Sequence, residues 1–283
     1  MEVEGVPLLI HTSEKWGRIW EFQARPDDVL ICTYPRSGTT WTQEIVDMIR
    51  HEGDLQKCAR APITQRVPFI ELSAPIFTHV SGLEAAEAMP SPRTLKTHLP
   101  VQLLPPSFWE QNCKIIYVAR NVKDNAVSYF HFHRMNQRMP EPGNWDQFLA
   151  NFIAGKVTWG SWFDHVRDWW KAKDHHPILY LFYEDMKMDP AHTIQKIAQF
   201  LELELPEPVL NQIIQHTNFE SMKANPMVNY TPFSHMDQTI SPFIRKGIIG
   251  DWKEHFTVAQ SEQLDVVIAR ELGGSNLMFR AQL

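Results

Sequence analysis

The 283 residues are 43% hydrophobic and 21% charged, which fits a soluble globular protein with a sizeable core in one large domain or two small ones. A formal net charge of −6 argues against nucleic acid and acidic membranes as partners. The three cysteines, Cys32, Cys58 and Cys113, show no metal-ligand spacing and favour a reducing, cytoplasmic compartment. The apolar run Val6–Ile10 is too short for a signal peptide or a membrane span.

A strand, a small polar loop and a helix are predicted in succession over residues 29–51. Residues 29–32 are apolar and partly β-branched, and Pro35 ends the strand because it has no N–H to donate. Gly38 can take unusual backbone angles, and Thr39 or Thr40 is predicted to cap the helix. Free N–H groups at such a helix start bind anions. The loop therefore predicts a phosphate cradle, to which Arg36, Ser37 and the two threonines add donors.

The remaining elements follow from the apolar periodicity. A helical pattern runs through Trp16, Ile19 and Trp20, and residues 53–92 and 224–250 are expected to be long loops. Further strands are predicted over 93–100, 114–121 and 177–185, and further helices over 125–133, 145–154, 159–171, 190–202, 206–216 and 258–272. Apolar strands that alternate with helices predict a single α/β domain over 1–283, with a central parallel sheet flanked by helices.

Candidate side chains stand at the end of each predicted strand: Arg36, then Lys96 and His98, then Arg120 with Ser128 on the next helix, then Tyr183. Ligands of open parallel sheets bind at the carboxyl ends of the strands, so these side chains are expected to share one site. A kinase would need a magnesium-binding carboxylate there. Because Glu184 and Asp185 end the fourth strand, a nucleoside or small-molecule kinase remains an alternative.

The loop sequence Thr33-Tyr34-Pro35-Arg36-Ser37-Gly38-Thr39-Thr40-Trp41 resembles the 5′-phosphosulfate loop of the cytosolic sulfotransferases. It departs at Arg36, where that family carries a catalytic lysine, so a catalytically weakened nucleotide-binding member is a further alternative. Tyr117–Asn121 with Ser128, and Arg245-Lys246-Gly247, resemble the two halves of the family's 3′-phosphate site. The phenol-type branch, family 1, is the most similar.

The resemblance implies 3′-phosphoadenosine 5′-phosphosulfate (PAPS) as donor, a phenolic or other small aromatic acceptor and no metal. By resemblance, Trp41 and Phe219 stack on the adenine with Tyr183 and Thr217 nearby, and His98 is the general base beside Lys96. Phe69, Phe132 and Tyr230 fall on the acceptor-pocket positions. Lys253, Thr257, Val258 and Glu262 fit the family's dimerisation pattern, which implies a homodimer; without the resemblance, Thr257 reads as a helix cap.

The residues themselves agree with such a donor. Arg36, Lys96, Arg120, Arg245 and Lys246 would oppose its negative charges, and arginine forks suit a terminal phosphate. Sulfuryl transfer would then depend on in-line positioning and charge stabilisation. A phenol has a pKa of about 10 and a histidine one of about 6.5, so a hydrogen-bonded His98 is a reasonable base.

Overall fold

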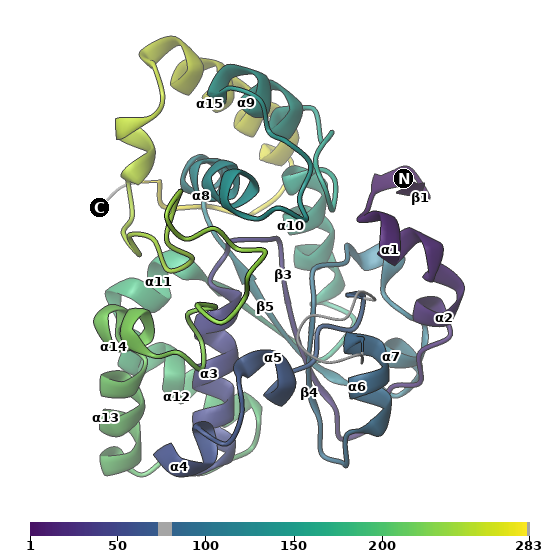
Figure 1. Cartoon of the computed structure of the whole chain (residues 1–283), viewed down its shortest axis with the longest axis vertical. Coiled ribbons are helices and arrows are strands. Elements are labelled where there is room, and N and C mark those ends of the chain that lie inside the picture. The colour runs from purple at the N-terminus through teal and green to yellow at the C-terminus, as the bar shows by residue number, and fades with distance from the viewer. Residues whose placement is uncertain (73–80, 282–283) are drawn as a thin grey trace.

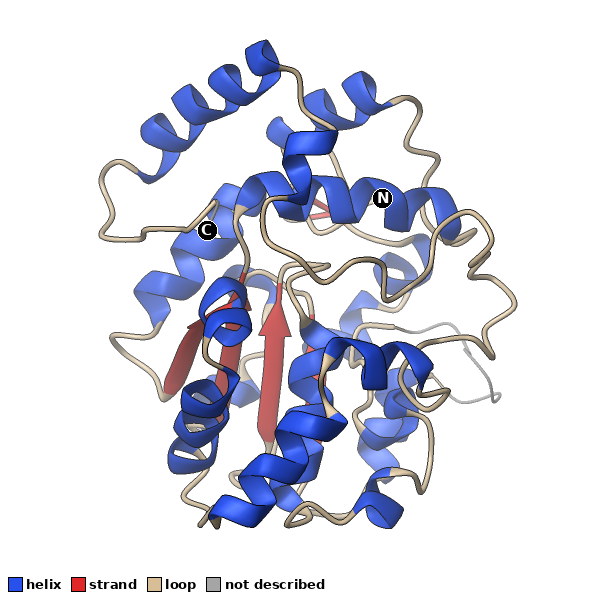
Figure 2. Cartoon of the chain, turned by 90° about the vertical axis from the view of Figure 1, so that its left-hand side faces the viewer, coloured by secondary structure: helices blue, strands red, loops and turns tan. Residues whose placement is uncertain are grey.

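A computed structural model describes residues 1–72 and 81–281. Its main sheet has four parallel strands in the order β4-β3-β5-β6, and these strands are Val29–Thr33 (β3), Thr94–Thr97 (β4), Lys114–Ala119 (β5) and Ile178–Phe182 (β6). The predicted parallel sheet is therefore confirmed. Figure 1 shows helices on either side of this sheet, and in Figure 2 the strand arrows point toward the layer of loops and helices at the top.

The helices before β5 are short apart from α3. They are Ile10–Glu14 (α1), Trp16–Trp20 (α2), Thr39–Arg50 (α3), Leu55–Cys58 (α4), Ile63–Arg66 (α5), Gly82–Ala88 (α6) and Ser107–Glu110 (α7). A two-stranded hairpin, Glu2–Val3 (β1) with Val6–Pro7 (β2), precedes them. The predicted irregular segment 53–92 thus contains α4, α5 and α6, and its residues 73–80 lie outside the described part of the chain.

The helices after β5 either cover the sheet or form the layer toward which its strands point (Figure 2). They are Val122–Met135 (α8), Trp145–Ile153 (α9), Trp162–Ala172 (α10), Tyr183–Met188 (α11), Pro190–Phe200 (α12), Glu207–His216 (α13), Phe219–Ala224 (α14) and Val258–Leu272 (α15). Single 3₁₀ turns lie at Val101–Leu103 and Asp251–Glu254. None of the described helices is long and apolar enough to cross a membrane.

Both faces of the sheet are buried because its strands are apolar throughout. Leu30 and Cys32 of β3 point into one core, which includes Trp162 and Trp169 of α10. Val29 and Ile31 point the other way, into a core with helices α3, α12 and α13. Alternate strand residues therefore anchor helices on opposite faces, as expected for a parallel sheet covered on both sides.

Three predicted boundaries are wrong. Gly38, not Thr39 or Thr40, is the N-cap of α3, with a left-handed φ of 94° that suits glycine. The helix predicted from 159 begins at Trp162, because Ser161 caps it and Trp159 has a φ of +67°. The fourth strand ends at Phe182, and Tyr183 begins α11. The other predicted helices and strands are confirmed to within a few residues, and so is the loop between α14 and Asp251.

Candidate active site

One cavity of about 480 Å³ opens at the carboxyl ends of the strands and contains nearly all the predicted site residues. Its wall includes Arg36, Gly38, Thr39, Thr40, Trp41, Phe69, Lys96, His98, Arg120, Ser128, Phe132, Tyr183, Thr217, Phe219, Tyr230, Arg245, Lys246 and Gly247. Ser37 is not among the lining residues; its buried hydroxyl accepts a hydrogen bond from Asn125 Nδ2 at 3.0 Å. Strand ends and loops far apart in the sequence thus meet at one place.

The side chain of Arg36 is held inside this cavity. Its Nη2 donates to the carbonyl of Phe243 at 2.7 Å and its Nε donates to Ser128 Oγ at 3.2 Å. The guanidinium also lies over the rings of Phe132 and Phe243, at 5.0 and 4.8 Å from their centroids. Burial, and secondly the charges of Arg120 and Arg245, lower the pKa of Arg36 to about 9. It remains a cation at neutral pH.

The end of β4 presents Lys96 and His98 to the cavity. The Nδ1 of His98 lies 2.8 Å from the carbonyl oxygen of Thr33, so in the neutral ring Nδ1–H donates and Nε2 carries the free lone pair. Burial and the nearby Lys96 lower the pKa of His98 well below its usual value. Burial also lowers the pKa of Lys96 to about 8. His98 is therefore a neutral imidazole at pH 7, beside a cation.

Glu71 is a buried residue of this site that the sequence did not single out. Its carboxylate accepts hydrogen bonds from the backbone N–H of His98 at 2.6 Å and from the Thr97 hydroxyl at 2.9 Å. Burial raises the pKa of Glu71 to about 7, against the opposing effect of these hydrogen bonds. The carboxylate of Glu71, which accepts these hydrogen bonds from the end of β4, therefore gains or loses its charge near neutral pH.

We expect Glu71→Gln to remove the part of the pH dependence of kcat that lies near pH 7. Ionised Glu71 accepts both hydrogen bonds and stabilises charged Lys96, so kcat should rise as the pH passes through about 7. A glutamine does not titrate and gives Lys96 no counter-charge, so the rise should disappear and kcat should instead fall as Lys96 loses its proton. The measurement is kcat between pH 5.5 and 8.5. An unchanged rise in the variant would show that another group causes it.

Aromatic side chains form the remaining walls. Phe69 and Trp159 both lie edge to face with the His98 ring, at centroid distances of 5.0 and 5.2 Å. Tyr230 packs on Phe243 at 4.0 Å and on Phe233 at 4.8 Å. Trp159, Phe233 and Phe243 were not predicted as site residues. Phe233 and Phe243 come from an irregular segment, where no apolar periodicity marks a position that faces the cavity, and Trp159 lies just before α10 in a stretch that was predicted to be helical.

Several nitrogen donors of residues in the cavity wall lack a hydrogen-bond partner among the described residues. Buried Arg120 Nε, Arg245 Nε and Trp41 Nε1 make no hydrogen bond. Asp251 binds both Arg245 and Lys246, and the backbone of Gly250 is tied to Asp124 at 2.8 Å, which fixes this segment beside α8. A Cβ on Gly247 would lie 2.4 Å from the Phe219 ring. This set of cations and rings fits a phosphorylated nucleotide.

The carboxylate that kept the kinase alternative open faces another way. Glu184 Oε1 accepts hydrogen bonds from the backbone N–H and the side-chain amide of Asn121, at 2.9 and 2.8 Å. Glu184 is buried, and burial raises its pKa. Neither Glu184 nor Asp185 is among the residues that line the cavity. The carboxylate therefore shapes the start of α8.

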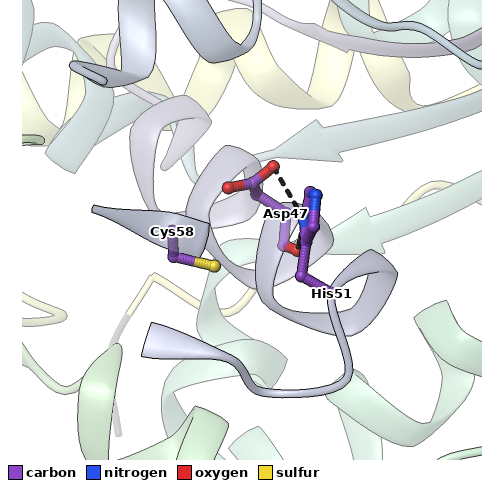
Figure 3. Close-up of side chains that lie close together, drawn as sticks. All are labelled: Asp47, His51 and Cys58. Carbon is purple, nitrogen blue, oxygen red and sulfur yellow. Dashed lines mark hydrogen bonds and ion pairs between the residues drawn. The ribbon is translucent and has the colours of Figure 1, made fainter. Parts of the chain in front are cut away.

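Figure 3 shows a second cluster, in which Asp47 and His51 at the C-terminal end of α3 lie close to Cys58 of α4; none of the three lines the cavity. Its ligand-type atoms lie within 4.8 Å of one another, and among the described residues it is the one group with such spacing. Both carboxylate oxygens of Asp47 are bound by arginines, Arg60 at 2.8 and 2.9 Å and Arg66 at 2.5 Å. Glu44 also pairs with Arg66, at 2.7 Å. The cluster is thus part of a buried ion-pair network.

Comparison with known proteins agrees with this site. The family model described as "Sulfotransferase domain" matches residues 26–276. The chain is 58% identical to rabbit sulfotransferase 1C2 and 57% identical to the human protein of that name, each over 100% of this chain and 95% of the relative. It is 53% identical to rat sulfotransferase 1 family member D1, over 100% of this chain and 96% of that one.

Two solved structures share the fold. Retinol dehydratase in a complex with retinol and PAP has a TM-score of 0.86 and 28% identity, over 96% of this chain and 89% of the other. Mouse sulfotransferase SULT7A1 complexed with PAP has a TM-score of 0.79 and 31% identity, over 98% and 95%. These relationships show a sulfotransferase and exclude the kinase alternative. The chain belongs to the cytosolic sulfotransferase family, is similar to its family 1 members, and is an enzyme of sulfuryl transfer.

Proposed function

We propose that this sulfotransferase moves the sulfuryl group of PAPS to the hydroxyl of phenolic or other small aromatic acceptors, with His98 as general base. The observation that carries the proposal is that one cavity holds a cationic loop, a neutral histidine and aromatic walls. Planar aromatic acceptors match walls such as Phe69, Trp159 and Tyr230. PAPS, as the co-substrate, would accept hydrogen bonds from the unpartnered N–H groups of the cavity wall.

Each proposed role follows from the chemistry of the side chain. His98 Nε2 would accept the proton of the acceptor hydroxyl, because Nδ1 is committed to the carbonyl of Thr33. Lys96 and Arg36 supply positive charge beside the reacting groups, which favours the developing negative charges of an in-line transfer. Arg120, Ser128, Arg245, Lys246 and the N–H of Gly247 would bind the 3′-phosphate, and Trp41 and Phe219 the adenine.

The main sheet and the extent of the family match also support a single catalytic domain over residues 1–283. The described strands of the main sheet form one continuous ladder, and the family match spans 26–276. We place this domain in the cytoplasm, with roles in the sulfation of xenobiotics and hormones, because its relatives are cytosolic sulfotransferases by family and its cysteines are buried thiols.

Radiolabelled PAPS with a panel of phenols, steroids, catecholamines and arylamines tests the acceptor class. We expect labelled product with simple phenols. A chain that transfers label to steroids or arylamines and not to phenols would contradict the aromatic-hydroxyl assignment. A chain that binds PAPS tightly and transfers label to none would be the weakened family member that Arg36 left as an alternative.

Arg120→Ala should weaken binding of the 3′-phosphorylated nucleotide by roughly 1.5–3 kcal/mol, the scale of a charged hydrogen bond. Arg120 lies over the Tyr183 ring at 4.4 Å, and its Nε has no partner among the described residues. Calorimetry with PAP and with the nucleotide that lacks the 3′-phosphate measures the difference. Binding of the second nucleotide should hardly change. Equal losses for both would contradict the assignment.

We also propose that the enzyme is a homodimer through Lys253, Thr257, Val258 and Glu262. These side chains are exposed, and Val258, at the start of α15, is 76% exposed. Thr257 caps this helix with Gln260 in a capping box, so the segment has a fixed shape. An exposed aliphatic side chain on a rigid helix start suits a small apolar contact with a second copy.

Val258→Asp should convert the dimer to monomer, because it places an unpaired charge in an apolar contact. An acidic residue is well tolerated in the first turn of a helix, so folding should survive. Val266→Asp is the matched control, since Val266 is 68% exposed on the same helix and lies outside the motif. Sedimentation velocity reports the state. A parent protein that is monomeric, or a Val258→Asp variant that stays dimeric, would contradict the proposal.

A further inference from the structure

Asp251 is a buried carboxylate that lies behind two cations of the cavity wall. It is 2% exposed and is not among the residues that line the cavity. Its Oδ2 accepts a hydrogen bond from Arg245 Nη2, and its Oδ1 accepts one from Lys246 Nζ at 2.5 Å. Both of these cations do line the cavity. Asp251 therefore holds two wall residues from outside the wall.

The two cations keep donors for a ligand while Asp251 holds them. A guanidinium has five N–H groups, and Arg245 Nε is buried with no hydrogen-bond partner among the described residues. An ammonium has three N–H groups, of which Lys246 gives one to Asp251 and one to Glu254, at 2.5 Å each. Asp251 thus orients the two side chains without using all of their donors.

The carboxylate of Asp251 is ionised at neutral pH. Burial alone would raise the pKa of Asp251, but the hydrogen bonds and charges of Lys246 and Arg245 lower this pKa overall. Hydrogen bonds between ionised partners are stronger and more directional than those between neutral groups. Replacement of Asp251 by asparagine therefore removes a fixed charge and one of the two acceptor oxygens.

The backbone on either side of Asp251 is fixed to α8. Asp124 of this helix accepts hydrogen bonds from the backbone N–H of Gly250 at 2.8 Å and from that of Trp252 at 3.0 Å. The side chain of Asp124 is itself buried. Asp251 therefore has a fixed place beside α8, although residues 225–250 before it lie in a long loop.

The two cations belong to the proposed site of the 3′-phosphate, where a fixed position is an advantage. Arg245 and Lys246 have long side chains, and a ligand that binds a freely rotating side chain must offset the conformational entropy lost when that side chain is ordered. Contacts that exist before the nucleotide arrives reduce this cost. The advantage applies to the phosphate that the two side chains bind. Asp251 should therefore affect the binding of one phosphate group selectively.

We propose that Asp251 is a positioning residue that sets the preference of this enzyme for 3′-phosphorylated nucleotides, by holding Arg245 and Lys246 toward the 3′-phosphate. This inference rests on the proposed binding of that phosphate by the two cations. Loss of the positioning and loss of the charge have opposite effects. Removal of a negative charge by itself favours the more anionic ligand, whereas loss of the positioning disfavours the ligand that carries the 3′-phosphate.

Calorimetry with adenosine 3′,5′-bisphosphate (PAP) and with adenosine 5′-phosphate (AMP) tests the proposal, because the two ligands differ only in the 3′-phosphate. Asp251→Asn should lower the ratio of PAP affinity to AMP affinity about tenfold, the scale of ordering two long side chains, and should leave AMP affinity within about twofold. The KM for PAPS should rise by a similar factor, whereas kcat at saturating PAPS should stay near that of the parent.

Glu254→Gln is the matched control. Glu254 also binds Lys246, but its side chain is 67% exposed, so water weakens the contact and the lysine is little ordered by it. The affinity ratio should stay at the value of the parent. A double variant with Arg245→Gln shows whether Asp251 acts through Arg245. In that background Asp251→Asn should change the ratio much less than it does in the parent.

A ratio that rises or stays unchanged in Asp251→Asn would overturn the inference. If Asp251→Asn does not bind AMP and so has no folded site, the ratio is measured on Asp251→Glu, which keeps the buried charge and displaces it by one methylene. A fall is expected there too, and an unchanged ratio would overturn the inference. If Arg245→Gln leaves the ratio unchanged, the proposed 3′-phosphate site itself is wrong. A fall with Arg245→Gln alone removes only the role of Asp251.

Discussion

His98→Ala is expected to lower kcat by about 10²–10⁴-fold, the usual contribution of a general base, while PAP binds nearly as before. The reason is geometric: Nδ1 is held by the Thr33 carbonyl at 2.8 Å, which leaves Nε2 as the basic nitrogen. His98 follows β4 and lies edge to face with the rings of Phe69 and Trp159. Steady-state kinetics with one phenol, and calorimetry with PAP, measure the two quantities.

His98→Asn is the control for a purely structural role. Its amide can still donate toward the Thr33 carbonyl, yet it has no basic nitrogen. If His98 is the base, the asparagine variant should be as slow as the alanine variant. Near-normal kcat in either variant would remove His98 from the mechanism. Recovery in the asparagine variant alone would assign His98 a positioning role.

Arg36→Ala is expected to lower kcat on the order of 10²-fold, the scale of losing one donor to a developing anion. Arg36 is the cation of the loop between β3 and α3, and it lines the same cavity as Lys96 and His98. Loss of donor affinity alone, with kcat retained, would show that Arg36 binds the ground state and takes no part in the transition state.

Arg36→Lys tests whether the guanidinium is a handicap. In the structure its Nη2 and Nε already donate to the Phe243 carbonyl and to Ser128, and only a planar fork can make both contacts while it lies over the rings of Phe132 and Phe243. A lysine ammonium is free of this restraint and can approach the leaving group. We expect a higher kcat with a donor KM within a few-fold. A slower lysine variant would show that the site is built around the guanidinium.

The sequence was sufficient for the elements that depend on continuous or periodic apolar residues. β3 and β5 are buried along nearly their whole length, and α3 and α12 bury the apolar stripes that predicted them. Because parallel strands end at one edge, the shared location of Arg36, His98 and Arg120 was also predictable from the pattern. Their individual roles came from resemblance, and they remain predictions.

The sequence analysis did not identify residues whose position depends on tertiary contacts, because the local pattern of residues does not encode such contacts. Trp159 continues an apolar helical pattern, yet its positive φ sets it outside α10 and turns its ring toward His98. Glu71 has no local signal, because its partners, Thr97 and His98, are more than twenty residues away. The Ser37 hydroxyl accepts a hydrogen bond from Asn125 of α8, a contact that the loop sequence does not indicate, and its role as a phosphate donor stays a prediction. Such assignments depend on tertiary contacts.

We claim above all that an enzyme with Arg36 in the loop between β3 and α3 turns over PAPS. The most direct measurement is steady-state transfer of labelled sulfate from PAPS to one neutral phenol in the presence of EDTA, together with calorimetric binding of PAP to the same preparation. We predict sustained multiple turnovers, since the proposed roles assign every step to side chains. Tight PAP binding without transfer above the background would contradict the claim and leave a nucleotide-binding protein that has lost its catalysis.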